Sequence, residues 1–251
     1  LHEINAKDAC VSQQTFELCA VGLLAELEVL DISLRSREQR IRGGLKGFPV
    51  VGMMGKKMGY DEVEITVYPF DGLIPALMTD NFDLIISGFT ISEERAKRVD
   101  FSDPYYRCSL TYLVKKEHAQ ELAKIESLKD KTVCTQIGTT GAMYIEKALP
   151  GINLKQFNSP AESYIELQND GCVATLNDRP VNDFYVTSSK VPNLASIEVA
   201  DATKEYYGIA VKKGNTALLK RINEGLKTTI ADGSFAQISD RWFGFDISTL
   251  L

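Results

Sequence analysis

Short apolar strands alternate with helices from residue 63 onward, and this alternation is what most constrains the fold. Strands are predicted at 63–68, 83–87, 110–116, 131–137, 172–176, 196–200 and 207–213, and helices at 71–79, 160–169, 181–189 and over the tail from 216 to 243. A further helix starts after the turn 138–141 and stops at Pro150-Gly151, a pair that breaks helices. The pattern predicts an α/β fold.

Composition excludes several classes of function. The chain has 251 residues, a net charge of -6 and a pI near 5.1, which argue against nucleic acid or an anionic membrane as partner. No uncharged apolar run reaches about 18 residues, so no membrane span is predicted. The two histidines, His2 and His118, disfavour histidine-based catalysis or a multi-histidine metal site. The five cysteines lack C-x-x-C spacing, so we expect no metal and no cofactor.

The first candidate site cluster follows the strand at 83–87. Ligands of open α/β sheets bind at such strand ends. Gly88 allows close backbone approach next to Ser87, Thr90 supplies a hydroxyl, and Arg95 carries a planar fork that matches a carboxylate. Taken alone, Arg95 also fits a solvated helix residue, and Ser92 fits a helix cap.

A second cluster lies at the strand-to-helix turn and a third at the end of the strand 172–176. The turn carries Gln136, Thr139 and Thr140, and its free N–H groups favour an anion, although Thr140 also fits an ordinary N-cap. Asp178 suits an ammonium group, or alternatively a loop contact with Arg179. Together with Arg95 these groups describe a receptor for a zwitterion. Gln136 suits a polar ligand, and no acidic cluster is visible that demands a basic one.

Phe70 precedes the helix at 71–79 and offers an aromatic wall to a ligand, although an apolar residue there is as often part of the core. Phe70 completes the list of predicted ligand-binding residues: Phe70, Ser87, Gly88, Thr90, Arg95, Gln136, Thr139, Thr140 and Asp178. No catalytic residue is predicted.

Several ordered motifs between residues 44 and 251 resemble the bacterial extracellular solute-binding proteins of family 3, which serve polar amino-acid ABC transporters. They are FDGLIPAL, DLIISGFTISEERAKRVDFSDPYY, QIGTTG, YYGIAVKKGN and ADGSFAQISDRWFG, together with the strand end at Asp178. The resemblance implies a two-lobed periplasmic-binding-protein type II fold with a double-crossover hinge. Lobe one would comprise 1–112 and 208–251, and lobe two 113–207. The strands near 110–116 and 205–212 would form the hinge.

The resemblance also implies roles for the site residues. Gly88, Thr90 and Arg95 would hold the α-carboxylate of a free amino acid with Thr140, Asp178 would hold its ammonium group, and Phe70 would pack on its side chain. The chain would then be a monomeric, non-enzymatic binding component that docks on an ABC permease. It would be periplasmic or extracellular, either free or lipid-anchored, with its signal peptide already removed.

Two alternatives use the same scaffold. One is a periplasmic dehydratase of the cyclohexadienyl type, for which Glu162 and Glu166 would be the candidate acids. The other is the sensor domain of a receptor, in which lobe closure is transmitted to a membrane segment.

The N-terminal region departs from the family pattern. Residues 45–59 keep Gly47-Phe48 but place Pro49 and Gly52 where acidic and helix-forming residues are expected. Residues 1–43 show no strand with an aromatic turn, and the stretch from 16 to 40 has helical periodicity instead. The sequence therefore predicts the loss of a lobe-one strand and of part of the binding wall.

Overall fold

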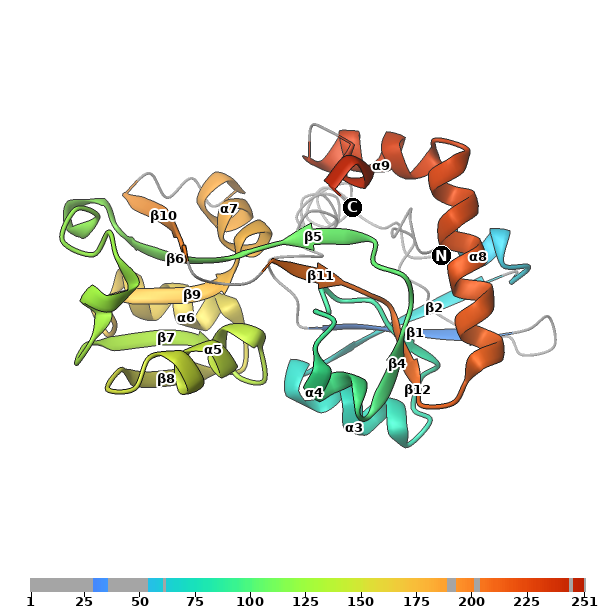
Figure 1. The fold of residues 1–251 in the computed structure, drawn as a ribbon, viewed down its shortest axis with the longest axis horizontal. Helices are drawn as coiled ribbons and strands as arrows, with labels where there is room; N and C mark the ends of the chain where they lie inside the picture. Colours follow the sequence, from blue (N-terminus) through green and yellow to red (C-terminus); the bar gives the residue numbers. More distant parts are fainter. Residues whose placement is uncertain are drawn as a thin grey trace, which may run out of the picture.

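The structure is a computed structural model. It describes residues 29–35, 54–60, 62–188, 193–200, 204–243 and 246–250, and for 29–35, 62–67, 188, 241–243 and 250 it describes only the course of the backbone. The chain forms two lobes, each built on its own five-stranded sheet, joined by a two-stranded sheet (Figure 1).

The first lobe contains a sheet of strand order β2-β1-β3-β12-β4, in which all neighbouring strands run antiparallel. Its strands are β1 (Val29–Arg35), β2 (Glu62–Tyr68), β3 (Leu84–Ile85), β4 (Val99–Phe101) and β12 (Ala210–Lys212), and its helical elements are η1 (Phe70–Gly72), α3 (Leu73–Met78), α4 (Glu93–Ala96), α8 (Thr216–Ala231), α9 (Ser234–Phe243) and η4 (Ile247–Leu250). Side chains alternate across the sheet, so Leu84 packs toward α8 while Ile85 packs toward α3.

Strand β1 corrects the prediction for the N-terminal region. Residues 29–35 lie inside the stretch assigned helical periodicity, yet they form a strand that pairs with β2 over seven residues and with β3 on its other side. Their sequence VLDISLR alternates apolar and polar residues, and pairing on both sides outweighs the helical spacing. The expected loss of a lobe-one strand is therefore wrong. The other residues from 16 to 40 lie outside the described part of the chain.

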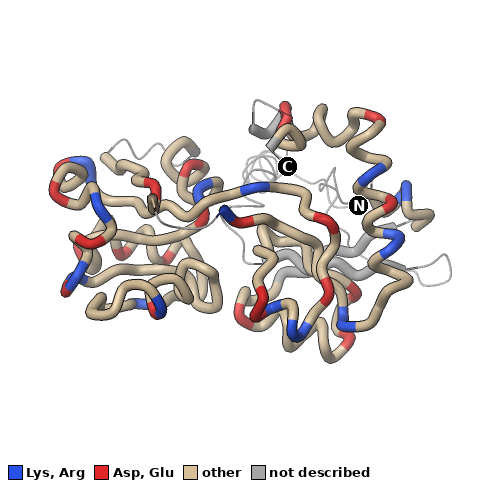
Figure 2. Tube along the Cα trace, viewed as in Figure 1, with Lys and Arg blue, Asp and Glu red and all other residues tan. Residues whose placement is uncertain are grey.

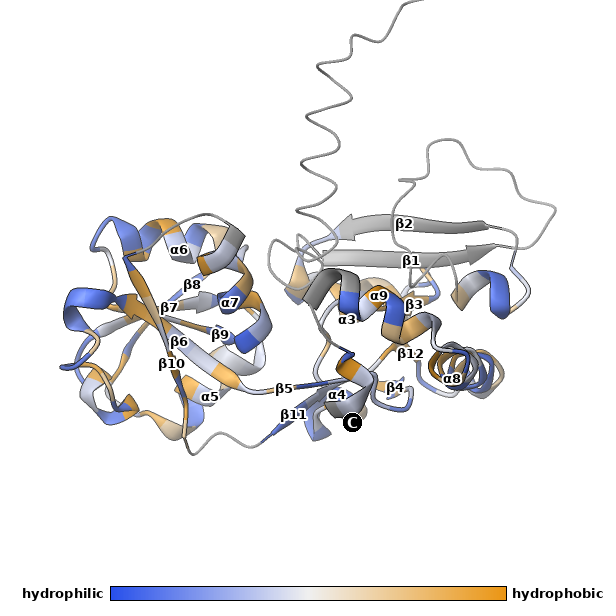
Figure 3. Ribbon diagram, turned by 90° about the horizontal axis from the view of Figure 1, so that it is seen from above, coloured by the Kyte–Doolittle hydropathy of each residue, from blue (hydrophilic) through white to orange (hydrophobic). Residues whose placement is uncertain are grey.

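The second lobe contains a sheet of strand order β10-β6-β9-β7-β8, parallel over β8-β7-β9 and antiparallel at β6. Its strands are β6 (Leu110–Lys115), β7 (Thr132–Gln136), β8 (Asn153–Phe157), β9 (Ala174–Asp178) and β10 (Leu194–Glu198), and its helical elements are η2 (Lys116–His118), η3 (Ile125–Leu128), α5 (Thr140–Ala148), α6 (Pro160–Gln168) and α7 (Arg179–Ser188). Figure 3 shows helices around this sheet, whose central strands β6, β7 and β9 are mostly buried.

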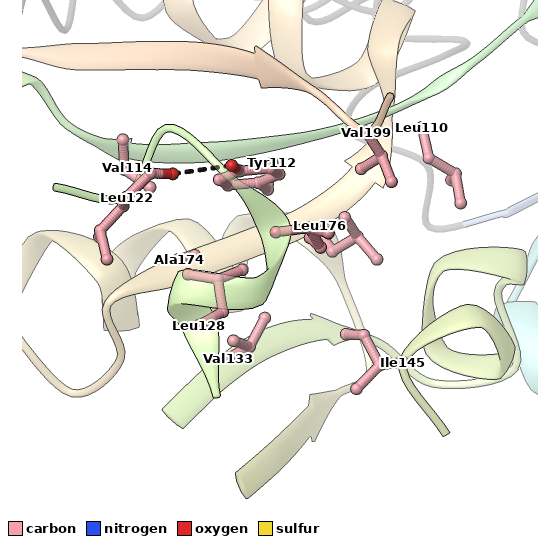
Figure 4. Packing of buried hydrophobic residues seen from close by; sticks show 11 residues of the cluster. Leu110, Tyr112, Val114, Leu122, Leu128, Val133, Ile145, Ala174, Leu176 and Val199 are labelled. Carbon is pink, nitrogen blue, oxygen red and sulfur yellow. Dashed lines mark hydrogen bonds between the residues drawn. The ribbon is translucent and has the colours of Figure 1, made fainter. Parts of the chain in front are cut away.

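Two apolar clusters cover the two faces of the second sheet. On one face Ile145 of α5 and the segment 119–128 pack on β6, β7 and β9, as Figure 4 shows for the larger cluster. There the hydroxyl of Tyr112 donates a hydrogen bond of 2.7 Å to the carbonyl of Leu122, which satisfies a polar group inside the core. On the other face Tyr164 and Leu167 of α6 pack against Cys134. The packing thus anchors β7 and β9, whose last residues are Gln136 and Asp178.

One hinge strand lies slightly upstream of its predicted position near 110–116, and the other lies within the predicted range 205–212. The hinge is the antiparallel pair of β5 (Tyr106–Cys108) and β11 (Glu205–Tyr207), whereas 110–115 belongs to the second sheet as β6. Strand β6 is buried along nearly its whole length, as a central strand is. The predicted strand 207–213 is interrupted after Tyr207, and β12 continues from Ala210 in the sheet of the first lobe. At Gly208, between the two strands, an added Cβ would lie 2.8 Å from the side chain of Ile91.

Acidic and basic residues are interspersed over both lobes in the view of Figure 2. The helices that the structure describes are too short or too polar to cross a bilayer.

Candidate functional site

A cavity lies between the two lobes, with about 40 Å³ of space for the centres of water-sized molecules. All nine residues predicted from the sequence line it: Phe70, Ser87, Gly88, Thr90, Arg95, Gln136, Thr139, Thr140 and Asp178. Lobe one, lobe two and the hinge strand β11 all contribute to the wall. The structure therefore brings together residues from four separate motifs.

The lobe-one wall begins where β3 ends. Gly88 has a φ of 53°, a left-handed conformation that glycine adopts at little cost. Ser87 is only 2% exposed, and its hydroxyl has no hydrogen-bond partner among the described residues. A buried polar atom without a partner is costly, and since Ser87 lines the cavity, a bound ligand would satisfy it.

Arg95 is buried at 4% exposure, so it is not the solvated helix residue that its charged neighbours allowed. Ser92 caps α4 by accepting a hydrogen bond from the Arg95 N–H group. The guanidinium donates to the carbonyl of Thr90 at 2.9 Å and to that of Gly138, in lobe two, at 3.1 Å. It lies 4.2 Å above the ring of Phe89 and 5.3 Å from that of Phe70.

Arg95 keeps its positive charge although it is buried. Desolvation lowers the pKa of Arg95 from 12.5 to about 10, against the opposing effect of the nearby Asp178 and Glu205 carboxylates, so the guanidinium stays protonated at neutral pH. A guanidinium has five N–H donors, and the two bonds to carbonyls leave three of them for a ligand. That arrangement suits a carboxylate.

The lobe-two wall is the turn that opens α5. Thr139, rather than Thr140, is the N-cap, since its hydroxyl accepts from the Ala142 N–H group. Thr140 is thereby free of the capping role and donates instead to Glu205 at 2.9 Å. Gln136 donates to the carbonyl of Asn158 at 2.9 Å.

Asp178 ends β9 and faces the cavity rather than its neighbour Arg179, which pairs with Asp183 at 3.2 Å. The hydroxyl of Tyr207 donates a hydrogen bond to Asp178. Burial, followed by the nearby Glu205 carboxylate, raises the pKa of Asp178 from 3.8 to about 7. An ammonium group bound beside Asp178 would relieve that repulsion.

Sequence reasoning missed two residues of the hinge strand β11. Glu205 accepts hydrogen bonds from the hydroxyls of Thr90, at 3.1 Å, and of Thr140, at 2.9 Å, and Tyr207 lines the cavity. Glu205 and Tyr207 are two positions apart in a strand and so share a face, but only the folded structure shows that this face meets Asp178. Pro160, Asn177 and Val181 also line the cavity.

An acidic cluster is therefore present, contrary to the reading of the sequence. The Sγ atom of Cys108 and one carboxylate oxygen each of Asp178 and Glu205 all lie within 4.8 Å of one another. Burial is the largest cause that raises the pKa of the Cys108 thiol, and it is also the largest cause that raises the pKa of the Glu205 carboxyl. The cysteine is held as a neutral thiol, so the negative charge of this cluster comes from the two carboxylates.

Comparisons with known proteins agree with this geometry. Residues 42–245 match the model of the bacterial extracellular solute-binding proteins, family 3. The chain is 33% identical to the ABC transporter arginine-binding protein 1 of Escherichia coli (strain K12) over 186 residues, which cover 72% of this chain and 74% of that protein.

Two solved structures of ancestral arginine-binding proteins are similar in sequence and in shape. The one bound to arginine is 35% identical with a TM-score of 0.74, and the one bound to glutamine is 34% identical with a TM-score of 0.71. Each similarity covers 82% of this chain and 91% of the other. The predicted type II periplasmic-binding fold, with two lobes and a double crossover, is confirmed.

Proposed function

Because the chain belongs to the bacterial extracellular solute-binding proteins of family 3, we propose that its cleft captures a free polar amino acid for an ABC transporter. One observation supports this most directly. The buried Arg95 and the carboxylate of Asp178 come from opposite lobes and line the same cavity, one cationic and one anionic. A zwitterion carries the two complementary charges.

The roles of the residues follow from their chemistry. The three remaining N–H donors of Arg95 would hold the α-carboxylate, next to the close approach offered by Gly88. Asp178 would hold the ammonium group, and Ser87 would gain a partner for its hydroxyl. Phe70 would pack against the ligand side chain.

Lobe closure would complete the site. Arg95 of lobe one donates to Gly138 of lobe two, and Glu205 accepts from one threonine of each lobe, so the contacts that line the cavity also join the lobes. We infer that ligand binding favours this closed arrangement over an open one. The lobe limits 1–112 with 208–251 and 113–207 remain a prediction.

We further infer that the chain acts as a monomer outside the cytoplasm, docks on a permease and catalyses nothing. The carboxylates named for a dehydratase have structural partners: Glu162 accepts from the Ser159 N–H group in the capping box of α6, and Glu166 pairs with Lys155. Neither is in the wall of the cavity.

The test is a thermal-shift screen of the purified chain against the twenty amino acids, ornithine, citrulline and prephenate, each at millimolar concentration. A ligand at about 100 times its dissociation constant should stabilise the fold by roughly 2.7 kcal/mol. Calorimetry then gives the dissociation constant of the best ligand. Silence across the amino acids, or stabilisation by prephenate alone, would overturn the proposal.

Substitution of Arg95 tests the site assignment. Arg95→Ala should weaken binding by at least about 2 kcal/mol, roughly thirtyfold in the dissociation constant, since the ligand carboxylate is left unpaired. Arg98, exposed and three residues further on, is the matched control, and Arg98→Ala should bind like the unmodified chain. Equal affinities in the two variants would remove Arg95 from the site.

A further inference from the structure

Glu205 changes what two of the cavity hydroxyls offer to a ligand. A threonine hydroxyl has one proton to donate and two lone pairs that accept. Both Thr90 and Thr140 donate to the same carboxylate oxygen of Glu205, at 3.1 and 2.9 Å. Their lone pairs are then what remains for a ligand. The hydroxyls expected to hold a carboxylate are thereby turned into acceptors, which suit a cation.

Glu205 also changes the charge balance of the site. The ionisable groups that meet around it are Arg95 from α4, Asp178 from β9, Cys108 from β5 and Tyr207 from β11. The thiol and the phenol are neutral, since burial raises the pKa of each. At pH 8, where Asp178 with its pKa of about 7 is mostly ionised, one cation therefore faces two carboxylates. A zwitterion with a neutral side chain leaves the excess negative charge uncompensated, whereas a cationic side chain compensates it.

The relatives leave the charge of the ligand open, because similar ancestral proteins hold arginine in one structure and glutamine in the other. We propose that Glu205, on the hinge strand, is a specificity-determining residue that makes the cleft select amino acids with a positively charged side chain. This inference rests on the proposed function and adds to it the charge of the ligand and the residue that reads it.

Arginine and citrulline provide the probe, since they have the same shape and differ in charge. The unmodified chain should bind arginine at least tenfold more tightly than citrulline in calorimetry at pH 8. Glu205→Gln removes the charge but keeps an oxygen that accepts from both threonines. This variant should reduce the preference at least tenfold, with little loss of affinity for citrulline. Glu205→Asp keeps the charge and should keep the preference.

Glu224, an exposed residue of α8, is the matched control, because Glu224→Gln removes the same charge far from the cavity. It should leave the preference for arginine unchanged. A preference that is equal in Glu205→Gln and Glu224→Gln would overturn the inference, and so would an unmodified chain that binds citrulline or glutamine as tightly as arginine. In both cases an amino acid still binds and the proposed function stands. Only a chain that binds no amino acid would overturn both.

Discussion

Asp178 and Glu205 are close carboxylates in a cleft that excludes much of the solvent. The contribution of Asp178 to the stability of the fold therefore depends on pH. The pKa of Asp178 is raised from 3.8 to about 7, first by burial and then by Glu205. The folded chain therefore holds this proton more tightly than the unfolded chain does. As the pH rises from about 4 to about 7, the unfolded chain releases the proton first. Asp178 must then lower the free energy of unfolding across that window.

Asp178→Asn should remove this pH-dependent decrease in the free energy of unfolding. Asparagine is neutral at every pH and its carbonyl oxygen can still accept from Tyr207. In urea denaturation without ligand, the variant should gain stability relative to the unmodified chain between pH 5 and pH 8. The expected gain is at least about 1.4 kcal/mol, the equivalent of one pKa unit. A difference between the two proteins that is the same at both values of pH would show that Asp178 titrates normally.

At the scale of elements, the turn between β7 and α5 has two roles: Thr139 caps α5, and Gly138 contacts the other lobe. Gly138 has a φ of 76°, and a Cβ there would lie 3.2 Å from the Cβ of Asp71 in η1 of the other lobe. Its carbonyl also accepts from Arg95. Gly138 of lobe two thus contacts lobe one through its backbone carbonyl, and its lack of a side chain permits the close approach to Asp71.

Gly138→Ala should weaken ligand binding about tenfold, because the added methyl group opposes closure against η1. It should also lower the free energy of unfolding by about 1 to 2 kcal/mol through left-handed strain. Gly233 is the matched control: its φ is also 76°, and an added Cβ meets no atom within 4 Å. Gly233→Ala should show the loss of stability in urea but bind ligand normally in calorimetry. Equal binding by both variants would mean that closure does not bring Gly138 against η1.

Sequence patterns predicted elements well where the signal was local. The end of β9 at Asp178 and the turn before α5 carry their own signals, an apolar run followed by polar or glycine residues, so their side chains could be assigned. In strand β1 the local signal is only a short alternation of apolar and polar residues. Its residues show helical spacing as part of a longer stretch, and only pairing with β2 and β3, distant in sequence, makes them a strand.

At the scale of the whole molecule, the same distinction explains which site residues could be predicted. Most of the nine predicted residues lie close to a strand end or a helix start, where one segment decides the direction of the side chain. Glu205 belongs to a short hinge strand whose contacts with Thr90 and Thr140 require both lobes and the hinge at once. No pattern within β11 contains that information, so the acidic character of the cleft could only be read from the structure.

The topology also makes the two lobes unequal in their dependence on the rest of the chain. All five strands of the second sheet and both of its apolar clusters lie between residues 110 and 199. The first sheet instead needs β12 from near the C-terminus, because β12 is the strand that pairs with both β3 and β4. The second lobe is thus a continuous segment of chain with its own core, while the first is assembled from two distant segments.

A fragment of residues 109–200 should therefore fold alone, whereas a fragment of residues 1–108 should not. The first keeps every strand pair of its sheet, and the second loses the strand that holds β3 beside β4. Circular dichroism during urea titration distinguishes them, since a cooperative transition is expected for 109–200 only. Neither fragment should bind an amino acid, because each carries only part of the cavity wall. A cooperative transition in 1–108, or none in 109–200, would contradict this division of the chain.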